Sequence, residues 1–392
     1  MIAFISDICL VGGNNAASAR IWNYAQSIRL SGEEVYVLSY QDFASGGALI
    51  EVEKGIYAYK GEGKRKGGVR RFLHELTTLV NEQLITGILF YPAPNPSFEL
   101  RFLFWRRRMR FKNVVCEINE VRKFEQTYLK TFSSFKRIVY KLVTSYSEKL
   151  SRYYKGIVCI SNNIREYFSQ YNKNAIVIPI LSDIPEKRLE RNYGGGHPFR
   201  FVFTGSVAIE KENLVELLHG FYDFNKRYTD WEFRLYGSIP QENYVRLQEI
   251  IGILDLEEKV RLMGEVDHDE IHIILASADC LILPRRNTKQ NYYGFSTKLS
   301  EYAVSGTPII LTDTGVVFNY FEDGRDCYKV SGYEAEGFCE QMMKVVTSSP
   351  SERRLVGDNA YETAKKYFDW HIYSKLLKDF ILNEYCDSNT YH

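Results

Sequence analysis

The stretch that decides the fold is YYGFSTKLSEYAVSGTPII, residues 292–310. Its centre is typical of a helix that packs on a sheet, and its end is typical of a buried strand. Within the helix, Lys298 and Glu301 lie three residues apart and therefore share one face. Either the two form a surface salt bridge, or both face a ligand at the end of the helix that follows the loop around Gly294.

Strands alternate with helices along the whole chain, which predicts parallel sheets with helices on both faces. The first half has strand-like runs at 2–8, 34–40, 84–93, 113–119 and 156–162 and a helix at Ala16–Leu30, and the pattern restarts at Phe199. Between the halves, 178–199 is rich in proline, glycine and charge, as linkers are. We expect an α/β protein with a first domain at 1–180, a second at 181–369, and a C-terminal helix at about 370–392 that packs back onto the first domain.

Composition and charge support two soluble domains. The 392 residues are 45% hydrophobic and 25% charged, and the seven cysteines include no CxxC pair, which favours reduced thiols over disulfides or a zinc site. The apolar N-terminus has no basic region before it, so we expect a first strand rather than a signal peptide.

Residues 1–180 hold 26 Lys and Arg against 15 Asp and Glu (net +11), whereas 181–392 hold 24 against 34 (net −10). Only the first half is expected to seek a polyanionic surface.

Two segments have the residues of a phosphate site. After the strand FRFVF, Gly205 ends the strand and Lys211 follows near the start of the next helix. Glycine lets backbone amides approach a ligand, and a helix N-terminus and a lysine both favour an anion. An ordinary strand-to-helix turn with a solvated lysine is the alternative. In the opening stretch, Ser296 and Thr297 can hold a diphosphate at the helix start, and Glu301 can accept hydrogen bonds from a ribose.

Five motifs in order resemble a known family. TGS with Lys211, LYGS, RLMGEV, ADCLILP and GFSTKLSEYAVSGTP look like the donor domain of the family 4 glycosyltransferases of the GT-B fold, over about residues 199–330. The N-terminal half resembles this family more loosely, through residues 11–39. The resemblance implies two Rossmann-like domains facing each other across a cleft. It also implies a retaining transferase that uses a nucleotide diphosphate sugar without a metal-binding DxD motif.

The resemblance also implies residue roles. Lys211 matches the family lysine that contacts the donor diphosphate, and Glu301 matches the second glutamate of the EX7E motif, which holds the ribose. Ser206 stands where an arginine is usual, and Tyr293 stands where the first glutamate would fall, so Arg285 or Lys298 is expected to supply the missing charge. The expected donor site comprises Gly205, Ser206, Lys211, Gly237, Met263, Gly264, Arg285, Gly294, Phe295, Ser296, Thr297, Lys298 and Glu301.

The acceptor side is expected in the first half. The loop at Gly12, Gly13 and Asn14 can approach the donor phosphate or the acceptor, although a purely structural turn is the alternative. By alternation Glu117 and Asn119 share a face of their strand, and Glu120 reaches beyond its end. Asn119 or Glu120 can bind an acceptor hydroxyl, or equally cap a helix or form a local salt bridge, and Glu120 joins Lys211 and Glu301 as an expected catalytic residue. The histidines have no metal-binding spacing, so neither a metal nor a cofactor is expected.

Basic and aromatic residues interleave in 101–112 and 136–155. This pattern suits a helix on an anionic membrane, with a solvated basic face as the alternative; no nucleic-acid-binding motif is present.

We therefore predict a retaining glycosyltransferase at the cytoplasmic face of the membrane. It would move a sugar from a UDP- or GDP-sugar to a glycan or a lipid-diphosphate-linked glycan in surface polysaccharide synthesis, such as lipopolysaccharide or capsule. Two alternatives are open. The protein is a nucleotide-sugar epimerase or hydrolase, or it is a catalytically silent scaffold that lacks the usual arginine and first glutamate.

Overall fold

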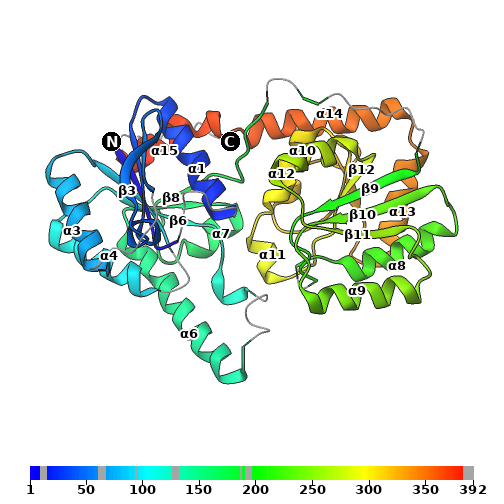
Figure 1. Cartoon of the computed structure of the whole chain (residues 1–392), viewed down its shortest axis with the longest axis horizontal. Helices are drawn as coiled ribbons and strands as arrows, with labels where there is room; N and C mark the ends of the chain where they lie inside the picture. The colour runs from blue at the N-terminus through cyan, green and yellow to red at the C-terminus, as the bar shows by residue number, and fades with distance from the viewer. Residues whose placement is uncertain are drawn as a thin grey trace. The chain divides into compact units, whose positions relative to one another are not determined.

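The computed structural model describes residues 1–8, 16–60, 68–92, 96–125, 132–185, 188–189, 197–209 and 211–382. The chain divides into two compact units (Figure 1). Unit 1 comprises Met1–Lys123, Phe132–Asp183 and Asp369–His392, and unit 2 comprises Phe124–Thr131 and Ile184–Phe368. Unit 1 is therefore discontinuous in sequence, because the chain leaves it after Asp183 and returns at Asp369.

In the described part of unit 1, eight strands form one sheet in the order β3-β4-β2-β1-β5-β6-β7-β8. The strands are β1 (Ile2–Ser6), β2 (Val35–Ser39), β3 (Ala48–Glu53), β4 (Ile56–Lys60), β5 (Gly87–Tyr91), β6 (Val114–Ile118), β7 (Gly156–Cys159) and β8 (Ala175–Val177). All neighbours run parallel except β3 and β4, which form an antiparallel pair. The sequence pattern did not predict this edge hairpin, whose tight turn depends on Gly55 at φ 76°.

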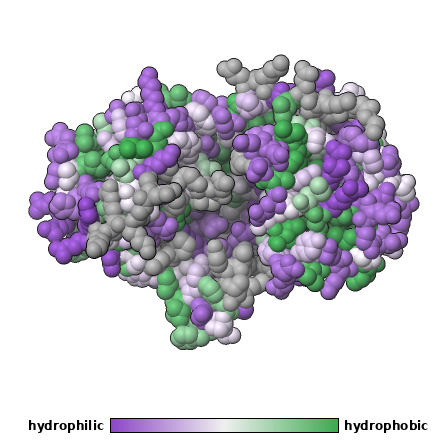
Figure 2. Space-filling view, viewed as in Figure 1, coloured by the Kyte–Doolittle hydropathy of each residue, from purple (hydrophilic) through white to green (hydrophobic). Residues whose placement is uncertain are grey.

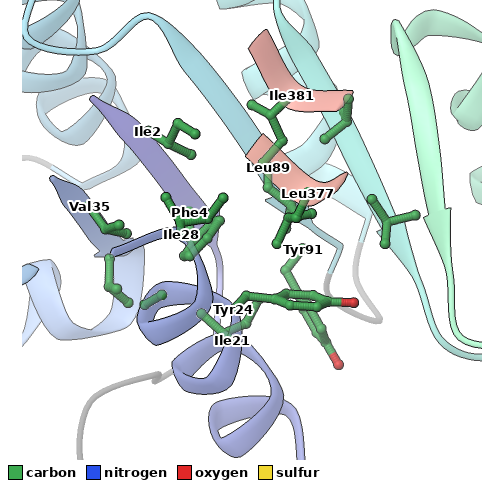
Figure 3. Close-up of a cluster of buried hydrophobic side chains, with 14 of the residues drawn as sticks. Ile2, Phe4, Ile21, Tyr24, Ile28, Val35, Leu89, Tyr91, Leu377 and Ile381 are labelled. Carbon is green, nitrogen blue, oxygen red and sulfur yellow. The ribbon is translucent and has the colours of Figure 1, made fainter. Parts of the chain in front are cut away.

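The helices of unit 1 cover this sheet. They are α1 (Ala16–Leu30), α2 (Tyr40–Ala44), α3 (Gly68–Asn81), α4 (Pro96–Met109), α6 (Ser134–Leu150), α7 (Asn162–Phe168) and α15 (Ser374–Leu382), with short 3-10 turns η1 (Arg122–Phe124), η2 (Ser151–Tyr153) and η4 (Trp370–Tyr373). The predicted C-terminal helix is thus two pieces, η4 and α15, and the residues after Leu382 lie outside the described ranges. Figure 3 shows Leu377 and Ile381 of α15 beside Leu89 in the core of unit 1.

The described residues of unit 2 form a six-stranded parallel sheet in the order β11-β10-β9-β12-β13-β14. Its strands are β9 (Phe199–Thr204), β10 (Trp231–Tyr236), β11 (Val260–Gly264), β12 (Cys280–Leu283), β13 (Ile309–Thr312) and β14 (Tyr328–Val330). Its helices are α8 (Leu214–Asn225), α9 (Gln241–Ile253), α10 (His268–Ser277), α11 (Lys289–Tyr293), α12 (Thr297–Ser305), α13 (Ala335–Thr347) and α14 (Pro350–Tyr367), and its 3-10 turn is η3 (Val317–Asn319).

Large aromatic side chains fill the core of unit 2. The ring of Phe221 on α8 stacks on Trp231 and on Phe233, each with ring centres 4.7 Å apart, and packs edge-on against Phe201. These rings are at most 1% exposed. Aromatic burial of this extent fixes α8 on the sheet and so fixes the turn that leads from β9 to α8.

Candidate donor site

Three glycines end neighbouring strands of unit 2. Gly205, Gly237 and Gly264 follow or close β9, β10 and β11 with φ of 105°, 130° and 78°. The N–H of Gly205 donates to the Tyr236 carbonyl at 2.8 Å, and the N–H of Gly237 donates to the Gly264 carbonyl at 2.7 Å. A side chain at Gly237 would lie 2.3 Å from the Gly205 oxygen. The backbones therefore approach more closely at this edge than any other residue type would allow.

The turn after β9 is held by hydrogen bonds from the segment that follows β12. The Lys211 carbonyl accepts hydrogen bonds from the Arg286 N–H at 2.9 Å and from Asn291 Nδ2 at 2.8 Å, and Asn291 also donates to the Arg286 carbonyl. Asn291 is buried, and no sequence pattern pointed to it. The Lys211 ammonium forms no ion pair with a described residue. Its charge is thus available to a ligand while its backbone is fixed.

Helix α12 is anchored to the end of β9. The buried Tyr302 hydroxyl accepts a hydrogen bond from the Thr204 N–H at 2.7 Å. Ser296 is the N-cap, yet its hydroxyl makes no capping bond, and the buried Oγ has no hydrogen-bond partner in the described structure. A helix N-terminus with an unpaired hydroxyl beside it can bind an anion. Glu301 lies half-buried on the second turn, and Thr297 is exposed at the start.

The loop before α12 is fixed by aromatic packing. Phe295 stacks on Tyr320 with ring centres 5.3 Å apart and meets Phe368 edge-on at 5.9 Å. This predicted donor-binding residue thus packs within unit 2. Gly294 has φ −75°, which other residues adopt, so this loop does not require a glycine for its backbone angle. Met263, in contrast, is exposed at the end of β11.

Glu212 gathers the two cations that were expected to replace the missing arginine. Its Oε1 lies 2.9 Å from Lys298 Nζ and 3.1 Å from Arg285 NH1. The Lys298 ammonium also donates to the carbonyl of the exposed Ser206 at 3.4 Å. Lys298 therefore reaches the glycine turn, and its carboxylate partner is Glu212, which the sequence interpretation did not single out.

The candidate acceptor residues lie in unit 1. Asn119 Nδ2 donates to the Tyr91 hydroxyl at 2.5 Å. Glu120 lines a cavity of about 50 Å³ together with Glu99 and Arg122. The loop at 12–14 lies outside the described residues.

Glu117, on β6, is buried and forms a cluster with Arg20 and Tyr24 of α1. Arg20 Nε binds Glu117 Oε1 at 2.6 Å, and the Tyr24 hydroxyl donates to Oε2 at 3.1 Å. The Arg20 guanidinium also donates to the carbonyls of Ile178 and Pro179 at 2.7 and 2.5 Å. Burial raises the pKa of Glu117 despite the opposing charge of Arg20. This ion pair joins α1 to β6 and to the segment that leaves unit 1.

The two basic and aromatic segments largely form α4 and α6, and only part of their apolar surface is exposed. Phe102 and Trp105 of α4 are buried in unit 1 and are not available to a membrane, whereas Phe104 is 71% exposed. Exposed apolar residues on α6 are Phe135, Ile138, Val139, Leu142 and Tyr146. Figure 2 shows hydrophobic surface beside hydrophilic surface where α6 projects in Figure 1. No helix of the described chain has the length and apolar character that crossing a bilayer requires.

Part of this chain is similar to known glycosyltransferases. Residues 198–348 match the family model described as glycosyl transferases group 1. The 2-deoxystreptamine N-acetyl-D-glucosaminyltransferase of Niallia circulans is 24% identical over 178 residues, which cover 45% of this chain and 43% of that protein. The O-antigen chain mannosyltransferase RfbU of Salmonella typhimurium is 24% identical over 178 residues, which cover 43% of this chain and 45% of RfbU. This chain therefore spans less than half the length of these curated relatives.

Solved structures extend the likeness to both units. The structure of Anabaena HepE in complex with UDP and glucose superposes with a TM-score of 0.68, covering 96% of this chain and 98% of that one at 13% identity. The fold, with two units built on parallel sheets, is the GT-B fold. Together, the family match and the fold support placement in the glycosyltransferase superfamily.

Proposed function

We propose that this protein is a retaining glycosyltransferase. It transfers a sugar from a UDP- or GDP-sugar to a glycan or a lipid-linked glycan in surface polysaccharide assembly. The observation that carries the proposal lies within unit 2. The glycine turn at Gly205 lies against Lys298 of the first turn of α12, the Lys211 ammonium forms no ion pair with a described residue, and the buried Ser296 hydroxyl at the start of α12 has no hydrogen-bond partner among the described residues. HepE, in complex with UDP and glucose, has the same fold.

The donor diphosphate is the group that these features suit. Cleavage of a sugar–phosphate bond develops negative charge on the leaving diphosphate, and cations and helix N-termini stabilise that charge in the transition state. We assign this role to Lys211, Lys298 and the first turn of α12, and we assign the ribose hydroxyls to Glu301. A metal ion is not needed in this scheme, because the protein supplies the positive charge.

Retention of configuration is proposed to follow from attack on the same face as the leaving group. The acceptor oxygen bonds to the anomeric carbon as the bond from that carbon to the phosphate oxygen breaks. The acceptor proton passes to the departing phosphate, so no protein base is required. Glu120 and Asn119 are the proposed contacts to the acceptor.

The acceptor is proposed to be presented at an anionic membrane. The exposed apolar residues of α6 lie among exposed cations, including Lys136 and Lys141, which suits a helix that dips into lipid headgroups. The likeness to RfbU, an O-antigen chain mannosyltransferase, supports the polysaccharide pathway. In vesicle sedimentation, Leu142→Asp should weaken binding to anionic vesicles by about tenfold, since it removes one exposed leucine that the lipid would otherwise bury. Ile253→Asp on α9 of unit 2, a site 82% exposed, is the control and should bind like wild type.

A donor-hydrolysis and calorimetric screen against UDP, GDP and their sugars tests the activity. Lys211→Ala and Glu301→Ala should each abolish turnover without changing the melting temperature, whereas Lys365→Ala and Glu362→Ala, at exposed positions of α14, should behave like wild type. Normal turnover in either site variant would refute the assignment.

A catalytically silent nucleotide-sugar-binding scaffold is the second candidate. It is favoured by the pairing of both Arg285 and Lys298 with Glu212, in a site that has Ser206 where the family has an arginine. Nucleotide binding without hydrolysis or transfer would support it.

A further inference from the structure

The two carboxylate oxygens of Glu212 have very different surroundings. Its side chain is 2% exposed, and one oxygen, Oε1, receives both Lys298 Nζ and Arg285 NH1. The other oxygen, Oε2, is buried and has no hydrogen-bond partner in the described structure. A buried carboxylate with an unsatisfied oxygen is unfavourable by several kcal/mol unless its charge is compensated. Two cations on one oxygen provide that compensation.

The three charged groups come from three different segments. Glu212 lies in the turn after β9, Arg285 lies just after β12, and Lys298 lies in the first turn of α12. The backbones of Glu212 and Arg285 also form an isolated antiparallel bridge. The carboxylate is therefore fixed in position by backbone pairing, and both cations are drawn to that fixed point.

With Glu212 as its partner, the Lys298 ammonium lies beside the glycine turn at Gly205. Its aliphatic chain packs on the glycine turn so closely that a side chain at Gly205 would lie 2.4 Å from Lys298 Cε. Its ammonium lies 4.1 Å from the centre of the Phe203 ring and bonds to the Ser206 carbonyl. The ammonium thus sits under the turn at which the donor diphosphate is proposed to bind.

Burial acts against a charged lysine in this position. Burial lowers the pKa of Lys298, Glu212 raises it in part, and Arg285 lowers it further. The net direction is downward, so the carboxylate of Glu212 is what keeps the lysine protonated to higher pH.

We propose that Glu212 is a positioning residue for donor binding. It holds Lys298 charged and aimed at the Gly205 turn, together with Arg285, without itself touching the donor. This inference rests on the proposed function, because it assigns the diphosphate of the nucleotide sugar to that turn. It also gives a role to a glutamate that follows Lys211 directly in sequence.

A double-mutant cycle tests the proposal. Affinity for UDP and GDP is measured by titration calorimetry for wild type, Glu212→Gln, Lys298→Met and the double variant. In the wild-type background, Lys298→Met should weaken binding of the preferred nucleotide by about tenfold. In the Glu212→Gln background, the same change should weaken it by less than about twofold, because a lysine without its partner no longer contributes. Glu249→Gln, an exposed glutamate on α9, is the matched control and should leave the tenfold effect intact.

The pH dependence of nucleotide binding provides a second test, because a purely structural role of Glu212 would leave it unchanged. Lys298 is charged below its pKa, so the binding that depends on it is lost as pH rises through that value. Glu212→Gln removes the carboxylate that raises the pKa of Lys298, so the alkaline loss of binding should move to lower pH. Should Glu212→Gln melt before it can be titrated, Glu212→Asp takes its place in the cycle. Aspartate keeps the charge but withdraws the oxygen by one methylene, so it should reduce the Lys298 effect and move the alkaline loss of binding to lower pH by less than removal of the charge would.

The outcomes are distinguishable. The positioning role is overturned if Lys298→Met weakens binding equally in both backgrounds, or if Glu212→Gln loses binding at the same alkaline pH as wild type. Either result leaves the glycosyltransferase proposal intact. A wild-type protein that binds neither UDP nor GDP overturns both.

Discussion

Replacing two glycines of the donor site by alanine should separate backbone strain from steric overlap. Gly237 and Gly264 both have positive φ, 130° and 78°. An added Cβ at Gly237 would lie 2.3 Å from the Gly205 oxygen, whereas an added Cβ at Gly264 has nothing within 4 Å. Gly264→Ala therefore carries only the strain of the left-handed conformation, about 1.5 kcal/mol. Gly237→Ala adds an overlap with backbone that cannot rotate away, for a total of about 4 kcal/mol.

These energies translate into melting temperatures. For a unit of this size, 1 kcal/mol lowers the melting temperature by about 2–4 °C. Gly264→Ala should lose about 3–6 °C and Gly237→Ala about 8–16 °C in the transition of unit 2, as measured by differential scanning calorimetry without nucleotide. The transition of unit 1 serves as the internal reference. Equal losses in the two variants, or a larger loss in Gly264→Ala, would refute the argument that the Gly205 and Gly237 backbones are in enforced contact.

Three further predictions concern the rest of the molecule. Arg20→Met should destabilise unit 1 by about 3–5 kcal/mol in urea unfolding, because it leaves the Glu117 carboxylate buried without its cation. The double variant Arg20→Met with Glu117→Leu should recover much of that stability. A double variant as unstable as Arg20→Met would contradict the pairing argument. Burial raises the pKa of Glu99 to about 7, against the opposing hydrogen bond from Tyr154 and the charge of Arg122. A raised acid pKa stabilises the protonated folded state, so the free energy of unfolding of unit 1 should fall by about 3 kcal/mol as pH rises from 4.5 to 7, and Glu99→Gln should flatten that slope. Turnover should be unchanged in excess EDTA, and a loss restored by Mg²⁺ or Mn²⁺ would show that the protein cations are insufficient.

The sequence predicted the architecture because its signals are local. The hydrophobic runs at β1, β2 and β9 and the bounds of α1 are properties of short windows, and the glycines at 205, 237 and 264 mark strand ends by residue type alone. The antiparallel hairpin of β3 and β4 was missed, because β3 lies at the sheet edge, where its residues are exposed or half-buried, and it lacks the continuous apolar run of a buried strand.

The charged core of the donor site could not be predicted in this way. Glu212 meets Arg285 and Lys298, residues 73 and 86 positions away, and no local pattern records such a pairing. Asn291 is likewise defined by two carbonyls that only the folded loop brings together. On α4, Phe102 and Trp105 alternate with arginines in sequence but lie on the buried side of the helix, so interleaving alone could not separate core residues from surface residues.

The return of the chain to unit 1 has a consequence for biosynthesis. Phe380 and Ile381 of α15 pack so closely on Gly156 and Gly87 that an added Cβ at these glycines would lie 2.5 Å and 2.6 Å from them, so the sheet of unit 1 packs against a helix that is translated after unit 2. At about 5–20 residues per second, the 185 residues between Asp183 and Asp369 take roughly 10–40 s to translate. During that time the nascent N-terminal half exposes the apolar surface that α15 later covers. Unit 2 can fold independently as it emerges. The polypeptide is thus expected to depend on chaperones chiefly through the N-terminal part of unit 1, which cannot complete its fold until α15 has been translated.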